Sequence, residues 1–475
     1  MKKILPAIAC LFVAFNAGAQ GYHITLQSNY RSGIAYLTYY LGKDLRLQDS
    51  AAVSSKGTAV FSSDKKLPPG IYAVVFPGKR YSADFLIEKE QNISIKADTN
   101  HIEQIQITGS PANIIFKGYR DFVNVKGRQL EQEKTAYRDS KTHADSTAHE
   151  LLYKRYSKEL NDYRQNIINS KPNSMMAALL NAMKDPPYPA KVAVTHADSL
   201  ENYNYFKDHY WDGVTFLDDR VIRTPFFMPK LETYYRQVMS QSSDSLIRDI
   251  DYRLLLARSS PEMYKFLLNW FTDEYINPKY MGQDAVFVHL FEQYHSRGTS
   301  VWLTDKQHED ITRRAYMLMS NLIGEKAANL EFTDTSGKPS SLYDVQSDYT
   351  VVVFWDPTCG HCKEEIPKID SIYRASWQKK NIKIYAVLAE SEKLKPEWLN
   401  YIRAHHIGDW INVYQTKEAA EIESKGESPS YRQLYDVTLT PTLYLLDKDK
   451  HIIAKKLTRE QINDFLEVKM KQPTN

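Results

Sequence analysis

The chain has 475 residues, of which 43% are hydrophobic and 12% aromatic, so it can bury several packed cores. Its length suggests about three domains. The 61 basic and 58 acidic residues leave a net charge of only +3, which argues against nucleic acid or an anionic membrane as the main partner.

The first 19 residues have the pattern of a cleaved export signal: a basic start, an apolar run over residues 4–15 and small residues at 17–19. We therefore expect a mature N-terminus at Gln20 and a periplasmic protein. The apolar run is too short to span a bilayer comfortably, and no comparable run follows. Cys10 also fits a lipoprotein signal, although the apolar run continues beyond it.

Residues 20–109 are predicted to form a β-rich domain. Short runs of β-branched and aromatic residues are separated by turn-forming glycine, proline and serine, and this spacing is typical of a small β-sandwich. The expected strands cover residues 34–40, 70–76, 84–87 and 92–96. No cluster of acidic residues, histidines or glycines in this part of the sequence resembles a catalytic site.

Residues 110–325 are predicted to form an all-α domain, because apolar and tyrosine residues recur at three- and four-residue steps. Prolines within this region mark breaks between helices. The cluster Asp218-Asp219-Arg220 has two interpretations, a metal site or a solvated turn with local ion pairs, and the second is favoured for charge clusters in general. This region predicts no chemistry of its own.

Residues 326–475 are predicted to form an α/β domain, so the chain as a whole is expected to be multidomain. After a hairpin at Gly337, the elements run strand, helix, strand, helix, strand, strand, helix, which is the thioredoxin order. The expected elements cover residues 350–354, 364–379, 381–388, 396–405, 442–446, 451–454 and 458–470. Pro367 is expected to kink the first helix, and Thr458 with Gln461 to cap the last one.

Three cysteines occur in the sequence, and removal of Cys10 with the export signal leaves the pair Cys359 and Cys362. Two cysteines this close cannot join distant parts of the chain, so they indicate redox chemistry rather than a structural disulfide. Cys359 lies where a buried strand ends and a helix begins, and the backbone N–H groups there favour its thiolate. Cys362, one turn further along and better shielded, is expected to be the resolving thiol.

Zinc binding is an alternative function for a Cys-x-x-Cys pair. Zinc requires four ligands, and the one histidine doublet of this domain, His405-His406, does not share a helix face. We therefore expect no metal and no cofactor. His361, between the two cysteines, can present positive charge to the Cys359 sulfur when its ring is protonated.

The motif around the cysteines resembles the active-site signature of the TlpA/ResA branch of exported, thioredoxin-like thiol-disulfide oxidoreductases. It reads Phe354-Trp355-x-x-x-Cys359-x-x-Cys362-Lys-x-Glu365-x-Pro367. Residues 436–442 resemble the cis-proline segment of that family, and the similarity covers roughly residues 327–475. The two earlier regions look, more loosely, like the N-terminal domains of many such envelope proteins.

The resemblance implies roles for individual residues. Glu365 matches the active-site carboxylate that tunes thiol acidity and assists proton transfer, with an exposed first-turn glutamate as the alternative. Pro441 matches a cis-proline that faces the disulfide, and Thr440 the residue that pairs with the substrate backbone. Trp355 and His361 are expected on the substrate side of the site, with core packing as the alternative for Trp355.

The sequence departs from the family pattern at three places. Thr358 stands where many relatives carry tryptophan, and Val353 where cytoplasmic thioredoxin has a buried aspartate. The dipeptide Gly360-His361 is that of protein disulfide isomerase. Its reduction potential of about −180 mV and that of thioredoxin, about −270 mV, differ by a free energy of about 4 kcal/mol for two electrons. The direction of electron flow therefore stays open. Residues 411–430 leave room for an insertion that could shape substrate choice.

We expect a periplasmic thiol-disulfide oxidoreductase that reduces or isomerises disulfides in exported proteins, with electrons from a membrane thiol-disulfide carrier. A thiol peroxidase is the first alternative, because peroxiredoxins share the fold. Their pattern has threonine three residues before the reactive cysteine. In this chain that position is Asp356 relative to Cys359, and Cys359 relative to Cys362. The second alternative is a binding or scaffold protein with an accessory redox domain.

Overall fold

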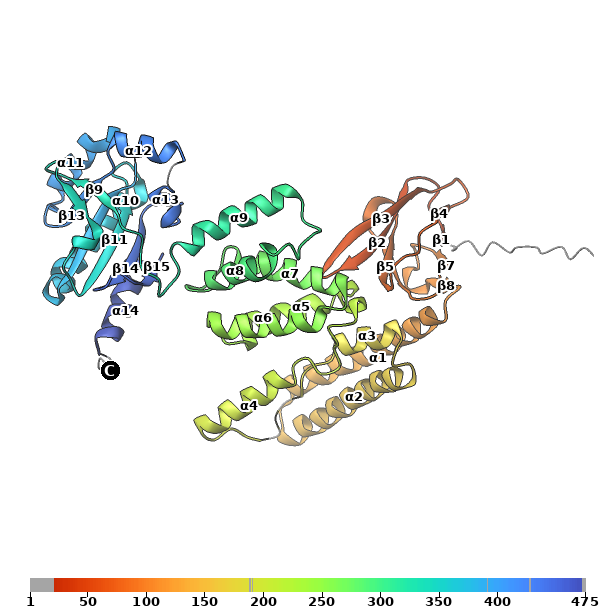
Figure 1. The fold of residues 1–475 in the computed structure, drawn as a ribbon. Coiled ribbons are helices and arrows are strands. Elements are labelled where there is room, and N and C mark those ends of the chain that lie inside the picture. The colour runs from red at the N-terminus through yellow and green to blue at the C-terminus, as the bar shows by residue number, and fades with distance from the viewer. Residues whose placement is uncertain (1–20, 188, 190, 391, 427–428, 472–475) are drawn as a thin grey trace, which may run out of the picture. The chain divides into compact units, whose positions relative to one another are not determined.

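The computed structural model describes residues 21–471 apart from positions 188, 190, 391 and 427–428 (Figure 1). The expected export signal, with Cys10, lies outside the described residues. No helix in the described part of the chain is long and apolar enough to cross a bilayer. The chain forms two compact units, Met1–Met239 with Leu255–Phe266, and Ser240–Leu254 with Leu267–Asn475.

The first unit begins with two four-stranded sheets, in the strand orders β4-β1-β7-β8 and β3-β2-β5-β6. Their strands are β1 Tyr22–Ser28, β2 Ile34–Leu41, β3 Asp44–Ala52, β4 Thr58–Ser63, β5 Gly70–Val75, β6 Ser82–Ile87, β7 Asn92–Ala97 and β8 Gln106–Thr108. Side chains of both sheets, such as Ile24, Phe61 and Phe85, are fully buried in one core. All four expected strands are confirmed, whereas β3 has mostly exposed side chains and so gives no hydrophobic pattern to predict it.

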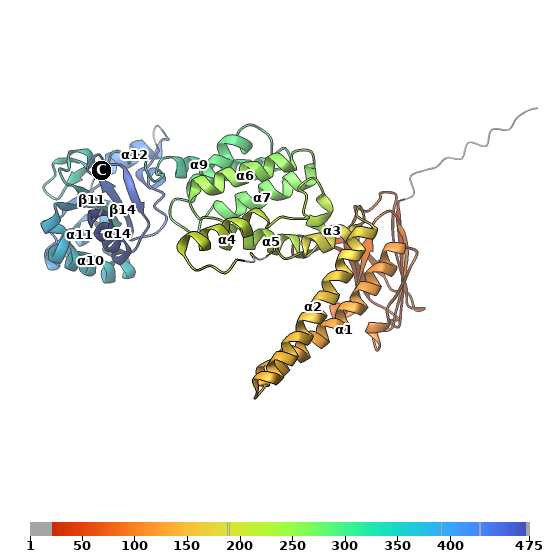
Figure 2. The ribbon, with the colours of Figure 1, turned by 90° about the horizontal axis from the view of Figure 1, so that it is seen from below.

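The strands are followed by helices, as predicted. Those of the first unit are α1 Pro111–Asp139, α2 His143–Ser170, α3 Met175–Ala182, α4 His196–Asp208 and α5 Phe227–Thr233. The long helices α1 and α2 lie side by side (Figures 1 and 2). In the 218–223 turn, Arg220 pairs with Asp218 at 2.6 Å and Arg223 with Asp219 at 2.9 Å. The ion-pair interpretation of this charge cluster is thus confirmed.

The second unit combines helices with one seven-stranded sheet of order β10-β9-β13-β12-β11-β14-β15. The strands are β9 Glu331–Asp334, β10 Pro339–Ser341, β11 Tyr349–Trp355, β12 Ile382–Leu388, β13 Ile411–Tyr414, β14 Thr442–Asp447 and β15 Ile452–Lys455. The helices are α8 Asp284–Leu290, α9 Asp305–Met319, α10 Gly360–Ile372, α11 Lys395–Ala404, α12 Lys417–Ser424, α13 Tyr431–Leu434 and α14 Arg459–Lys471. Two further helices, α6 Ser243–Ala257 and α7 Pro261–Tyr275, contribute residues to both units.

Strand β11 lies inside the sheet, parallel to β12 and antiparallel to β14. Successive side chains of a strand point to opposite faces, so Val353 and Trp355 enter one core and Val352 and Phe354 the other. Residues of α10, α11 and α14 complete the first core, and Tyr431 of α13 belongs to the second. Both faces of the sheet are therefore covered, as an α/β thioredoxin-like domain requires.

The predicted thioredoxin order is confirmed, with two corrections. Helix α10 begins at Gly360 rather than at 364, because Cys359 serves as its N-cap, and Pro367 lies inside it. Residues Ile411–Tyr414, expected to begin an insertion, form β13, which pairs with β12 and β9. The cap of α14 is as predicted, since the Thr458 N–H donates to Gln461 Oε1 at 2.9 Å and the Gln461 N–H to Thr458 Oγ1 at 3.3 Å.

A buried ion pair ties the last sheet strand to a helix of the same unit. Lys455 of β15 pairs with Asp284 of α8, and their side chains are only 6% and 4% exposed. The Lys455 ammonium also donates to the Asn321 carbonyl at 2.6 Å and to Asn321 Oδ1 at 2.7 Å. Burial lowers the pKa of Lys455, and Asp284 counteracts that shift. The charge is thus held in place by polar partners that come from another part of the unit.

Replacing Asp284 with alanine should strongly destabilise the second unit. Lys455 would remain buried without its counter-charge, and losing one partner of a buried pair costs about 3–5 kcal/mol. The measurement is the free energy of unfolding in urea. Glu421→Ala is the matched control, because it removes an exposed pair with Lys417 and should cost less than about 1 kcal/mol. Similar losses in both variants would contradict the expectation.

Candidate active site

The loop after β11 places Cys359 at the start of α10. Asp356 Oδ1 accepts hydrogen bonds from the Thr358 N–H at 2.7 Å and the Thr358 hydroxyl at 2.8 Å. The Asp356 carbonyl accepts from the Cys359 N–H at 3.3 Å. Cys359 itself has an extended backbone, with φ −68° and ψ 124°, as the N-cap of α10. Its sulfur therefore stands at a helix N-terminus, where backbone N–H groups lack intrahelical partners.

The Cys359 thiol is more acidic than an ordinary cysteine. Its partial burial raises the pKa, but hydrogen bonds from the Cys362 backbone, the Thr440 side chain, the Cys362 thiol and the His361 backbone outweigh burial, and the net pKa is lowered. The backbone groups belong to the first turn of α10. Cys359 thus has the environment of an attacking thiolate.

Cys362 has the opposite environment. Its side chain is fully buried in the core beneath the sheet, and this burial raises the pKa of the thiol to about 12. Both cysteines are unbridged in this structure. A thiol that is protonated and shielded cannot start an exchange, but it can attack a disulfide formed on its neighbour. The geometry agrees with the predicted division into attacking Cys359 and resolving Cys362.

The segment before β14 faces the attacking sulfur. The Thr440–Pro441 peptide bond is cis, as the sequence resemblance implied. The Cys359 Sγ lies 3.6 Å from the Thr440 carbonyl oxygen, to which the thiol can donate. The loop is held by the Thr442 hydroxyl, which donates to the Leu439 carbonyl at 2.6 Å. The structure therefore brings Thr440 and Pro441 together with the cysteine pair.

Glu365 lies one turn after Cys362, and its carboxylate forms ion pairs with two basic side chains. Its Oε1 lies 3.2 Å from Lys368 Nζ, and its Oε2 pairs with Arg459 at the start of α14. The side chains of Glu365 and Arg459 are 15% and 16% exposed. Arg459 was not predicted, since 94 residues separate it from Glu365 and no local pattern links them. The carboxylate is thus near the site but held by an arginine.

Comparison with known proteins identifies this domain. Residues 323–455 match the AhpC/TSA family. Thiol-disulfide oxidoreductases named ResA from Bacillus thuringiensis subsp. konkukian and Bacillus anthracis are each 26% identical to the chain over 147 residues, which is 30% of this chain and 76% of each relative. The C-terminal domain is a TlpA/ResA-like thiol-disulfide oxidoreductase.

Solved structures similar to the chain include a domain of a possible thiol-disulfide isomerase from Cytophaga hutchinsonii, with 42% identity over 32% of this chain and 94% of that one (TM-score 0.27). A thioredoxin-like protein from Bacteroides caccae is 23% identical over 60% of this chain and 99% of its own (TM-score 0.45). Residues 22–116 and 139–321 match families described as domains of unknown function, DUF4369 and DUF5106. The named activity of these relatives therefore concerns the TlpA/ResA-like domain.

Trp355 and His361, both expected on the substrate side of the site, differ in solvent exposure. Trp355, expected to contact substrate, is fully buried, with its ring 5.1 Å from that of Tyr401. A side chain with no exposed surface cannot touch a substrate, so the structure corrects that assignment and supports core packing. His361 is exposed at the start of α10, where a substrate can reach it.

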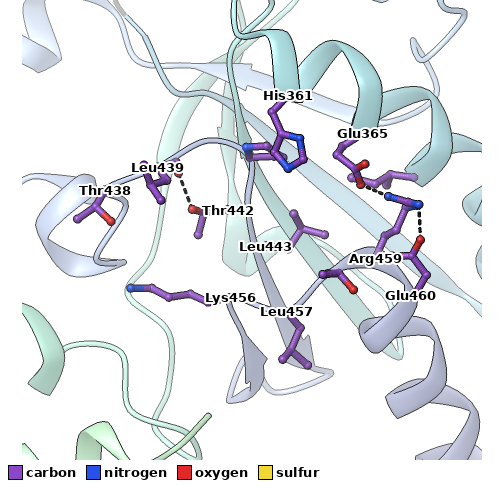
Figure 3. A pocket seen from close by; sticks show the side chains of 13 residues that line it. His361, Glu365, Thr438, Leu439, Thr442, Leu443, Lys456, Leu457, Arg459 and Glu460 are labelled. Carbon is purple, nitrogen blue, oxygen red and sulfur yellow. Dashed lines mark hydrogen bonds and ion pairs between the residues drawn. The ribbon is translucent and has the colours of Figure 1, made fainter. Parts of the chain in front are cut away.

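A groove of about 360 Å³ lies beside the cis-proline of the TlpA/ResA-like domain (Figure 3). We call it the active-site groove. It is lined by His361, Glu365, Ile369, Thr438, Leu439, Pro441, Thr442, Leu443, Lys456, Leu457, Thr458, Arg459 and Glu460. Figure 3 shows Glu365, Arg459 and Glu460 linked along one side. The groove gathers three of the predicted site residues, His361, Glu365 and Pro441.

Metal-binding geometry occurs elsewhere in the TlpA/ResA-like domain. Among the described residues, Asp447, Asp449 and His451 form the one group of this kind. They lie at the last residue of β14 and in the turn that follows, at the opposite end of that strand from Pro441. Asp447 Oδ1 accepts from the backbone N–H groups of Asp449 and His451 at 2.9 and 2.8 Å, so a tight turn explains the cluster.

Alkylation of the reduced protein should distinguish the two thiols. The lowered pKa of Cys359 keeps its thiolate populated below the usual cysteine range, whereas the raised pKa of Cys362 keeps that thiol protonated up to about pH 12. At pH 7, iodoacetamide should therefore modify Cys359 first and leave Cys362 protected, as mass spectrometry of peptides can measure. The rate at Cys359 should fall as the pH drops through its pKa. Equal rates at the two sulfurs would contradict this expectation.

The contact between Glu365 and Arg459 should be energetically coupled. Both side chains are largely buried, so a double-mutant cycle with Glu365→Gln and Arg459→Met should give a coupling of about 1 kcal/mol or more in unfolding free energy. The same cycle on Lys158 and Asp162, which are 75% and 57% exposed, serves as the control and should give about 0.5 kcal/mol or less. No difference between the cycles would show that Arg459 does not hold Glu365.

Proposed function

We propose that the protein is a periplasmic enzyme that reduces or isomerises disulfide bonds in exported proteins through Cys359-Gly-His-Cys362. The observation that carries this proposal is the placement of the two thiols: Cys359 is part-exposed at the N-cap of α10 and 3.6 Å from the Thr440 carbonyl, whereas Cys362 is fully buried. Their pKa values shift in opposite directions, downward at Cys359 and upward at Cys362. Exchange through a mixed disulfide requires one accessible thiolate and one protected thiol next to it. The export pattern of residues 1–19 supports the periplasmic location.

The reaction follows from these two environments. The Cys359 thiolate attacks one sulfur of the substrate disulfide, the S–S bond breaks, and one substrate sulfur leaves as a thiolate. Cys362 then gives up its proton and attacks Cys359 Sγ, which releases the second substrate sulfur and closes the Cys359–Cys362 disulfide. Two electrons pass from the enzyme to the substrate, and the proton of Cys362 ends on a departing thiolate.

The oxidised enzyme must be reduced again before it can act as a reductant. By analogy with the family, the electrons come from a membrane thiol-disulfide carrier. Stabilisation of the Cys359 thiolate makes the reduced form more favourable and raises the reduction potential, which suits isomerisation as well as reduction. In isomerisation the substrate's own second thiol attacks the mixed disulfide, and no external electrons are consumed.

A peroxidase function receives less support from the site. In the predicted alternative, a threonine hydroxyl three residues before the reactive cysteine would be required. Asp356 stands there, and its carboxylate accepts hydrogen bonds from Thr358. It therefore organises the loop instead of donating a hydroxyl hydrogen bond to Cys359.

We infer that residues 20–109 form a β-sandwich, because two four-stranded sheets bury one common core. The limits 110–325 and 326–475 remain our proposed boundaries for the helical and TlpA/ResA-like domains.

Insulin reduction by dithiothreitol tests the proposed activity. The wild type should accelerate the reduction, and Cys359→Ser should return the rate to that without enzyme. Cys362→Ser is the matched comparison, because it keeps the attacking thiolate. Reduced, freed of dithiothreitol and mixed with insulin, it should accumulate a mixed disulfide with an insulin chain, visible on a non-reducing gel. Equal rates of insulin reduction with the wild type and with Cys359→Ser would contradict the proposal.

A further inference from the structure

A second depression continues the active-site groove within the same compact unit. It has a volume of about 450 Å³ and shares Thr438, Lys456 and Leu457 with the active-site groove. Its far side is formed by residues 277–282, which precede α8. A continuous path therefore runs from Pro441 past Lys456 and Leu457 to this loop, which we call the 277–282 loop.

The 277–282 loop is fixed to the TlpA/ResA-like domain. The Lys455 backbone N–H donates to Met281 Sδ at 3.4 Å. Three residues further on, Asp284 pairs with the Lys455 side chain in the buried ion pair described above. Gly282 has φ 87°, a left-handed conformation that glycine adopts without strain and that turns the chain into α8. The loop thus forms a preformed wall of the path.

The charges along the path are mostly satisfied by one another. Asp436 pairs with Arg314 at 2.7 Å and also with Lys456. Arg459 pairs with Glu365, as described for the active-site groove. Most charged side chains along the path are therefore already paired, so a highly charged ligand would gain little binding free energy from them.

Apolar side chains are exposed at both ends of the path. Leu439, two residues before Pro441, is 77% exposed, and Tyr280 and Met281 of the 277–282 loop are 47% and 41% exposed. Tyrosine and methionine are enriched at protein interfaces. The path thus offers apolar contacts at a distance from the cysteines.

We propose that this path binds an extended stretch of unfolded polypeptide, with an apolar or aromatic side chain of the client seated on Tyr280 and Met281. The inference rests on the proposed function and deepens it, because it adds a contact on the 277–282 loop for a polypeptide client. Continuity with the active-site groove supports a polypeptide, because a small disulfide at Cys359 would leave the 277–282 loop empty. The helical region then contributes directly to client selection.

Peptides of two lengths test this inference with the full-length protein. A short peptide carries a disulfide between two cysteines with few flanking residues, and two long peptides add a Phe- and Leu-containing extension before or after it. With dithiothreitol as the reductant, kcat/KM of the wild type should be about tenfold higher for at least one long peptide, the effect of one well-buried anchor. Tyr280→Ser and Met281→Ser should lower this ratio towards one.

The matched control is Val468→Ser, which changes an apolar residue of α14 that is 59% exposed in the same unit and should keep the wild-type ratio. Fluorescence anisotropy of a labelled long peptide without cysteines should show weaker binding to Tyr280→Ser than to Val468→Ser. Equal kcat/KM for short and long peptides, or a ratio unchanged by both loop substitutions, would contradict peptide binding at the 277–282 loop. Neither outcome would contradict the oxidoreductase activity. No turnover of any peptide would overturn the proposed function itself.

Discussion

The burial of β11 on both faces is the constraint on which the site depends. Its side chains enter two cores in alternation, so a shift of one residue would exchange the two sets and is strongly disfavoured. The strand ends at Trp355, and the short turn that follows places Cys359 at the N-cap of α10. Cys362, one helical turn later, must then point back into the core. The different chemistry of the two sulfurs is therefore a consequence of packing.

The lowered pKa of Cys359 comes from both backbone and side-chain groups. The lowering contributions come from backbone N–H groups of the first turn of α10, from Thr440 and from the Cys362 thiol. Glu365, which the family pattern suggests as the tuning carboxylate, instead faces Arg459 and Lys368. The backbone contribution to this acidity depends on the start of α10, and not on which side chains occupy the two positions between the cysteines.

In the thioredoxin-like domain, elements that depend on local sequence patterns could be predicted, and contacts between distant residues could not. Apolar runs mark β11 and β12, and the Thr458–Gln461 cap marks α14, so these elements follow from neighbours along the chain. The strand β13 is four residues long and lies where an insertion was expected, because so short a run has no distinct period. The pairing of Arg459 with Glu365 joins residues far apart in the sequence, and only the folded sheet brings them together.

The pairing of Asp284 with Lys455 joins two residues that are 171 positions apart. Asp284 lies in α8, before the thioredoxin-like sheet, and Lys455 ends the last strand of that sheet. A chain that ends before β15 therefore lacks more than a sheet edge, because the Asp284 carboxylate, only 4% exposed, loses its counter-charge.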